Sequence, residues 1–410
     1  MAALFVDENE LEKFRHSVLA DASRTHYGVL VGYAVQSKSE LKTTLIAFIP
    51  TPCEEGRLPK AFRDFDMERL AAHAREVSRY LVGGIYVVGF YTVSPAADVD
   101  SGAVQSAFKS LSSRASLPFL SSTDGAERAR DTFHVHFDTI KRSSPPKVQS
   151  FSLSKEGAVK MQPIVLKTQD AHKDRELIMI HSRFALSCTI GSLAPAGLIS
   201  IRTCLERCYP SVADAPKAAQ AKDLLGKEIH FFSSSCPSDT AAGSFVVKGT
   251  VAAAACVCAS APCKDVFDAL RQDAYASLRY RLERLHLETN HSKDLDASKQ
   301  QSLGRRFILP AFVGGCCISD CVTRHETPDS VITLLSDVFG SSIATGEYVF
   351  IEDDELDLLA GKLQHASAAV AATQPPKAAQ RAEDNRATTS KLNLIVVIVV
   401  ALAIVAKFVL

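Results

Sequence analysis

The sequence predicts a mixed α/β (α+β) protein of two domains that ends in one membrane-spanning segment. A length of 410 residues is room for two or three domains, and 47% hydrophobic with 22% charged residues is an ordinary globular composition. The last stretch, Leu392–Leu410, is apolar except for Lys407. We therefore expect a first domain over residues 1–150, a second over 151–359, a flexible stalk over 360–391 and a membrane anchor over 392–410.

Strand and helix signals alternate through the first 150 residues. Short apolar runs predict strands, and apolar residues at helical spacing between Asp64 and Tyr80 predict a helix that Asp64 or Asp66 caps and that Gly83-Gly84 ends. The expected elements are a helix over Asn9–Leu19, strands over Tyr27–Val35 and Thr43–Ile49, a helix over Asp64–Tyr80, a strand over Ile85–Tyr91, a helix over Ala103–Arg114, and strands over Thr132–Thr139 and Lys147–Leu153.

The second half combines longer strands with one long helix. The expected elements are strands over Leu177–Ile190, Glu228–Ser234 and Ser244–Cys258, a helix over Lys264–Leu287, a short helix over Val331–Phe339 and a closing strand over Glu347–Ile351. We expect the polar face of the long helix, with Arg271, Arg279, Arg281 and Arg284, to be solvated. We also expect the acidic run Glu352–Asp357 to begin a solvated helix.

The C-terminal segment has the length of a bilayer-spanning helix. Its residues reach about 28 Å as a helix, close to the thickness of the hydrocarbon core. Basic residues precede it (Lys377, Arg381, Arg386, Lys391), so the positive-inside rule places the N-terminal part in the cytosol. This pattern is typical of a tail anchor, and a buried core segment is the alternative.

Charge and cysteine content exclude other classes. Lys+Arg and Asp+Glu both number 46, whereas a nucleic-acid-binding protein needs a basic face. The eleven cysteines lack the spacing of zinc knuckles, and Met1–Asp21 has no apolar stretch typical of a signal peptide. We therefore expect reduced, mostly buried thiols and no metal or other cofactor.

The order strand, strand, helix and buried strand, followed by Gly89-Phe90-Tyr91-Thr92-Val93-Ser94-Pro95, resembles an MPN domain. In catalytic members of that fold, a strand carrying His-x-His, a later Asp and a Glu on the first strand bind zinc and activate its water. This sequence has other residues at every matching position: Thr25, Thr92, Ser94, Gly102 and Gln105. Hydroxyl groups do not hold zinc at neutral pH, so the resemblance implies a catalytically dead, MPN-like domain that is not an enzyme.

A second His-x-His lies downstream at His134 and His136. Ser144 follows at the motif's spacing, but Lys147 stands where the motif needs a carboxylate. An active zinc-dependent isopeptidase that uses His134 and His136 is therefore the alternative interpretation, and it lacks a third ligand and a base.

Several blocks, in order, resemble the odorant response abnormal protein four family: Gly28–Gly32, Thr51–Glu55, His73–Arg79, Gly83–Gly89 and Arg305–Pro310, closed by the apolar C-terminus. The resemblance implies a tail-anchored adaptor at the endoplasmic reticulum. It also implies, as partners, the cysteine protease specific for the ubiquitin-fold modifier, through MPN-like pairing, and heptahelical receptors that need help in folding and trafficking.

Overall fold

The computed structural model describes residues 3–360, apart from 20–24, 38–39, 54–58, 60, 96–98, 100, 115–131, 142–143, 154–158, 170–175, 191–194, 213–218, 234–244, 292–300, 314–315, 324–325, 341–347 and 354–355. The expected anchor, Leu392–Leu410, and all but the first residue of the expected stalk lie outside the described residues. Within the described part of the chain, no helix combines the length and the apolar character needed to cross a membrane.

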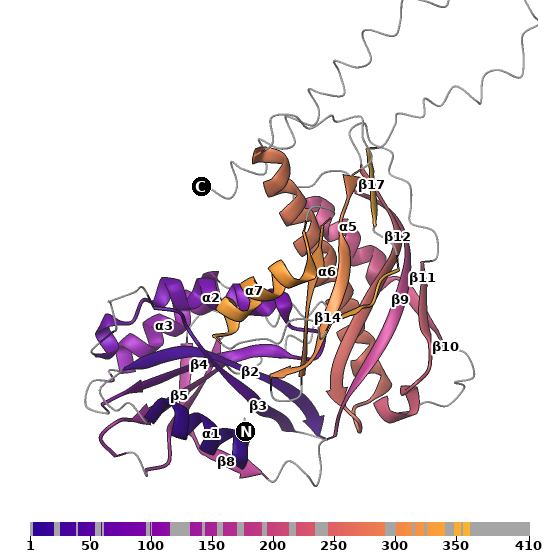
Figure 1. Cartoon of the computed structure of the whole chain (residues 1–410). Helices are drawn as coiled ribbons and strands as arrows, with labels where there is room; N and C mark the ends of the chain where they lie inside the picture. Colours follow the sequence, from indigo (N-terminus) through magenta and orange to yellow (C-terminus); the bar gives the residue numbers. More distant parts are fainter. Residues whose placement is uncertain are drawn as a thin grey trace, which may run out of the picture.

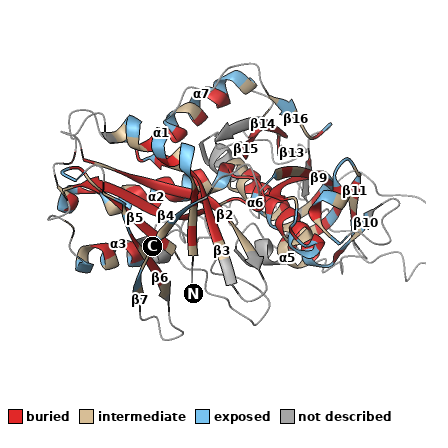
Figure 2. Cartoon of the chain, turned by 90° about the horizontal axis from the view of Figure 1, so that it is seen from below, coloured by how far each residue is buried: buried red, intermediate tan, exposed pale blue. Residues whose placement is uncertain are grey.

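A large sheet forms the first half of the molecule (Figure 1). In spatial order, its described strands are β7 (Val159–Ile164), β6 (Lys147–Leu153), β5 (Thr132–Asp138), β4 (Tyr86–Ser94), β2 (His26–Ser37), β3 (Glu40–Pro50), β1 (Ala3–Asp7) and β8 (Leu166–Gln169). The strands expected over Tyr27–Val35, Thr43–Ile49, Ile85–Tyr91, Thr132–Thr139 and Lys147–Leu153 are confirmed. Figure 2 shows β4 as buried along most of its length, as its continuous apolar run predicts.

This sheet extends past the boundary expected at residue 150. Strand β6 continues to Leu153, β7 pairs with it, and β8 pairs in parallel with β1 through Leu4 and Leu166. The physical reason is that β1 has backbone hydrogen-bonding groups along both sides, and β8 completes one of these sides. A pairing between such distant segments leaves no mark in local sequence periodicity.

Helices cover both faces of the first sheet. On one face, α2 (Met67–Tyr80) and α3 (Ser101–Arg114) pack on a core that includes Val29, Phe90 and Phe151. On the other face, α1 (Glu8–Leu19) packs on the opposite side chains of the same strands, and Figure 1 shows α1 across the sheet from α2. The three helices confirm those expected in this half of the chain.

Helix α2 begins with a side-chain cap. The carboxylate of Asp66 accepts hydrogen bonds from the backbone N–H groups of Glu68 and Arg69, both at 3.0 Å. Asp66 is therefore the cap of α2, whereas Asp64 lies in the preceding 3-10 turn, Phe62–Asp64. Such a cap stabilises a helix by about 1 kcal/mol, because it satisfies N–H groups that have no partner within the helix.

Among its described residues, the second half contains two further sheets and three α-helices (Figure 1). The described strands of the larger sheet are, in order, β10 (Cys208–Val212), β11 (Ile229–Ser233), β9 (Leu177–Ile190), β12 (Phe245–Cys258), β17 (Asp357–Ala360) and β13 (Gln301–Ser302). The smaller sheet contains β15 (Cys316–Val322), β14 (Arg305–Val313) and β16 (Val349–Phe350), and the helices are α5 (Pro195–Glu206), α6 (Cys263–His291) and α7 (Pro328–Phe339).

The two halves meet where the chain leaves α2. Gly83 N–H donates to Ala254 O at 3.0 Å, and Cys256 N–H donates to Gly83 O at 2.8 Å. A Cβ at Gly83 would lie 2.3 Å from Ala269 O on α6, so only glycine fits this approach. The helix ends at Tyr80, because Leu81 is already extended, and not at the glycine pair that the sequence predicts as its end. The glycine pair instead lets the first half pack against β12 and α6.

Candidate functional site

Three of the positions that match the MPN zinc motif, Thr25, Thr92 and Ser94, lie at one end of the first sheet. Thr25 directly precedes β2, is buried, and donates its hydroxyl to Pro59 O. Thr92 and Ser94 point to the same face at the end of β4, and both are fully buried. Gly102 and Gln105 belong to the first turns of α3, where Gln105 Nε2 donates to Val159 O at 3.4 Å.

Strand β5 brings His134 and His136 to this same place. It runs parallel to β4, with His136 opposite Thr92. The hydroxyl oxygen of Thr92 lies 2.8 Å from His134 Nε2 and 3.1 Å from His136 Nδ1. The sequence interpretation treated these histidines as separate from the motif, whereas the fold places both rings against a motif position. Their alternation in an apolar run was the signal that could have revealed this, because alternate residues of a strand share a face.

One arrangement of protons satisfies this cluster. Gln149 Oε1 lies 3.5 Å from His134 Nδ1 and accepts a hydrogen bond from its N–H group. His134 Nε2 is then unprotonated and accepts a hydrogen bond from the hydroxyl of Thr92. A threonine hydroxyl has a single proton, so its oxygen in turn accepts from His136 Nδ1–H. The second nitrogen of His136 then has a lone pair, and neither this atom nor Ser94 Oγ has a hydrogen-bond partner among the described residues.

Both histidines are neutral at physiological pH. Burial and, to a smaller extent, the nearby His136 lower the pKa of His134 to about 3. Burial also lowers the pKa of His136 to about 4, although the Asp138 carboxylate opposes this shift. A neutral imidazole can bind a metal, but the described residues contain no group of three or more His, Cys, Asp or Glu side chains that could hold one.

A second polar cluster is buried between α6 and the smaller sheet. Arg306 makes a two-pronged ion pair with Asp273, at 2.5 and 2.8 Å, and Arg281 Nη2 lies 2.8 Å from Glu352 Oε1. All four side chains are almost completely buried. The expectation that Arg281 is solvated is therefore wrong, and so is the expectation that Glu352 begins a solvated helix. Their mutual charge compensation makes burial possible.

The block Arg305–Pro310, which carries part of the family resemblance, thus has a structural role. Arg306 also donates to Ser319 Oγ at 2.7 Å and to Ala252 O at 3.2 Å, which ties β14 to β15 and β12. Arg305 stacks its guanidinium on the ring of Phe350, 4.2 Å from the centroid. The block fixes the small sheet against the larger one.

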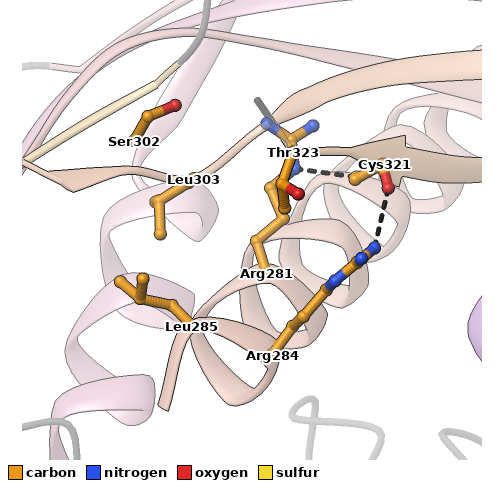
Figure 3. A pocket seen from close by; sticks show the side chains of 7 residues that line it. All are labelled: Arg281, Arg284, Leu285, Ser302, Leu303, Cys321 and Thr323. Carbon is orange, nitrogen blue, oxygen red and sulfur yellow. Dashed lines mark hydrogen bonds between the residues drawn. The ribbon is translucent and has the colours of Figure 1, made fainter. Parts of the chain in front are cut away.

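A small pocket lies beside this cluster (Figure 3). Its lining residues are Arg281, Arg284, Leu285, Ser302, Leu303, Cys321 and Thr323. Arg281 Nε donates to Cys321 Sγ at 3.1 Å and Arg284 Nη1 to Cys321 O at 2.9 Å, as Figure 3 shows. Both guanidinium groups also pair with carboxylates, Glu352 and Glu326, so the pocket is not suited to attract an anion.

The exposed side of α2 is a candidate surface for MPN-like pairing with a partner. It presents Glu68, Ala72, Arg75, Glu76 and Arg79 to solvent. Arg79 lies 3.8 Å from Glu283 of α6 and its guanidinium lies 6.0 Å from the ring centroid of Tyr280. Arg75 is therefore the better probe of this surface, because reversing the charge of Arg79 would also disturb the contact with α6.

Comparison with known proteins gave one family and a set of distantly similar solved structures, which includes the following two. The first structure is the crystal structure of UfSP from C. elegans, at 12% identity and a TM-score of 0.37, covering 83% of this chain and 57% of that one. The second is the solution structure of DSY2949 from Desulfitobacterium hafniense, at 15% identity and a TM-score of 0.24, covering 42% of this chain and 97% of that one. This chain thus spans little more than half the length of the nematode protein, and likenesses this weak carry no argument about function. Among curated proteins, none matches the sequence.

The family match is extensive. The model of the ODR4-like family, described as odorant response abnormal 4-like, matches residues 28–221 and 227–348. These ranges include the strands of the threonine–histidine cluster and the buried ion pair between Arg306 and Asp273. The chain belongs to the ODR4-like family.

Proposed function

We propose that this protein is a non-enzymatic, tail-anchored adaptor that faces the cytosol from the endoplasmic reticulum membrane. In this proposal it recruits the cysteine protease specific for the ubiquitin-fold modifier and assists the folding and trafficking of heptahelical receptors. The family membership supports this role. The observation that carries the proposal is the replacement of every zinc-binding and general-base position by Thr25, Thr92, Ser94, Gly102 and Gln105.

The geometry around Thr92 supports an adaptor rather than a hydrolase. A catalytic zinc ion needs several ligand atoms that converge on one point at about 2.0–2.1 Å from each nitrogen. Here, His134 Nε2 and His136 Nδ1 do converge, but on the hydroxyl oxygen of Thr92, at 2.8 and 3.1 Å. A covalently fixed oxygen thus occupies the point between the two nitrogens.

The exposed side of α2 is the surface we assign to the protease partner. Its charges are mixed, with Glu68 and Glu76 near Arg75, which suits a specific polar contact. The opposite side of the helix packs into the core through Leu70, Ala74 and Val77, which are all fully buried, so the surface is rigid. Such rigidity lowers the entropic cost of association.

Affinity purification of the full chain from detergent extract, followed by mass spectrometry, tests this role. We expect the protease to copurify with the unmodified chain and with Lys222→Glu, which reverses an exposed charge on the other half of the molecule. We expect Arg75→Glu to weaken its recovery, because it reverses a charge on α2. Equal recovery with both variants would remove α2 from the contact, and absence of the protease from every sample would contradict the recruitment itself.

Metal analysis distinguishes the adaptor from the alternative isopeptidase. We expect the purified chain to contain no stoichiometric zinc and to cleave no isopeptide bond. One zinc per chain that disappears in His134→Ala and His136→Ala variants would contradict the adaptor proposal in favour of a zinc enzyme.

A further inference from the structure

Two exposed aromatic side chains stand side by side on the larger sheet of the second half. Tyr209 is 68% exposed and Phe232 is 54% exposed. They lie directly opposite each other in the antiparallel pair of β10 and β11. The next strands continue the row with Ala185 on β9 and Thr250 on β12, so small side chains flank the aromatic pair.

The row belongs to the face of the sheet that helices α5 and α6 leave uncovered. The neighbouring residues in each strand, such as Phe184 and Phe231, point the other way and are fully buried, with their rings stacked at 4.1 Å. The outward positions of β9, which are His181, Arg183, Ala185 and Ser187, are all exposed. Figure 1 shows β9, β11 and β10 at the outer edge of the molecule.

Acidic and basic groups are mixed next to the row, and they include Lys248, which is exposed opposite Ser187 on the same face. Arg183 Nη1 lies 2.7 Å from Asp353 Oδ2, and His230 Nε2 lies 3.3 Å from Glu228 Oε2. A surface on which acidic and basic groups are mixed around two aromatic side chains has little attraction for a strongly charged partner. It suits the boundary between lipid headgroups and acyl chains, where Tyr side chains in particular place an apolar ring and a polar hydroxyl.

The point where the described chain ends favours a membrane as the occupant. The last described strand, β17, pairs with β12 at Phe245–Lys248, within this same sheet. From there, residues 361–391 lead to the apolar segment Leu392–Leu410. The flexible stalk that the sequence predicts there would average about 30 Å from end to end, so insertion of the segment would hold the sheet close to the bilayer and raise its effective concentration there.

We propose that the uncovered face around Tyr209 and Phe232 is a second membrane contact, which docks on the lipid surface when Leu392–Leu410 is inserted. This inference rests on the tail anchor of the proposed function. The face would orient the cytosolic part on the membrane. Because acidic and basic groups are mixed around it, we expect neutral phosphatidylcholine to be sufficient for docking, without anionic lipid.

The chain contains no tryptophan, which makes a direct test possible. The Phe232→Trp variant and a matched control, Leu334→Trp at a 61% exposed position on α7, are reconstituted as full chains into phosphatidylcholine vesicles with and without brominated acyl chains. We expect emission from Phe232→Trp to shift to shorter wavelength and to lose a large part of its intensity with brominated lipid. Emission from Leu334→Trp should stay unchanged. Adding Tyr209→Glu to Phe232→Trp should abolish the quenching.

Resistance to alkaline carbonate, measured on the same vesicles, separates the two proposals. If the chain resists extraction but both variants are equally unquenched, the docking face is wrong and the anchor stands. If carbonate extracts the chain, the anchor of the proposed function is wrong. A shift of the tryptophan emission to shorter wavelength that grows with protein concentration, without quenching by brominated lipid, would identify a second copy of the chain as the occupant. This result would overturn the membrane contact.

Discussion

Replacing Asp273 by alanine should strongly destabilise the protein. Its carboxylate accepts four hydrogen bonds: from Arg306 at 2.5 and 2.8 Å, from Gly83 N–H at 3.1 Å and from Ala254 N–H at 2.8 Å. The Asp273→Ala variant would leave the Arg306 charge, which is 3% exposed, buried without its partner. Breaking a buried ion pair in this way costs about 3–5 kcal/mol, a large part of the 5–15 kcal/mol that stabilises a typical protein.

Urea unfolding of the full chain in detergent, followed by far-UV circular dichroism, measures this loss. The matched control is Asp353→Ala, because Asp353 makes an equally short ion pair of 2.7 Å with Arg183 but its side chain is 75% exposed. We expect the control to lose less than about 1 kcal/mol. A double variant, Asp273→Leu with Arg306→Met, should recover part of the stability because no charge is stranded, but not all of it, because Ala254 N–H loses its acceptor. A loss below about 1 kcal/mol for Asp273→Ala would refute the reasoning.

Three further predictions concern α2, the histidines and the C-terminal segment. The Asp66→Ala variant should lower the free energy of unfolding by about 1 kcal/mol, measured by urea unfolding, because two N–H groups of α2 lose their acceptor; an unchanged midpoint would contradict the cap. Burial lowers the folded-state pKa values of His134 and His136 to about 3 and 4. The contribution of the neutral histidines to the free energy of unfolding is therefore complete above about pH 6.5. It is lost as the pH falls toward those pKa values, by about 1.4 kcal/mol per histidine per pH unit. The wild type should therefore lose more stability between pH 7.5 and 5.5 than His136→Gln, and equal losses would contradict the buried neutral state. Deleting Leu392–Leu410 should release the protein from membranes, and Val400→Arg should do so in part, since a central arginine costs about 2.5–3.5 kcal/mol on an insertion scale; a truncated chain that still resists carbonate extraction would refute the anchor.

Local patterns determined the secondary structure of this protein well. The strands Leu177–Ile190 and Lys147–Leu153 match their expected ranges, and α2 begins behind one of its two expected caps. Period-2 alternation, apolar helical spacing and side-chain caps arise between residues a few positions apart, so the sequence alone displays them. The family resemblance rests on the same kind of evidence, because each of its blocks is a short contiguous run.

The tertiary structure decided which polar side chains are buried and what they contact. Thr92 meets His134 across 42 positions of sequence, and Arg281 meets Glu352 across 71. In the sequence, Arg281 belongs to the polar side of an amphipathic helix and Glu352 to an acidic run, and both patterns are typical of solvated surfaces. Only the pairing of β14 with β16 brings Glu352 over α6, where each charge removes the cost of burying the other. Composition and periodicity report how a residue relates to its neighbours along the chain, whereas compensation between buried charges depends on strands that meet only in the folded sheet.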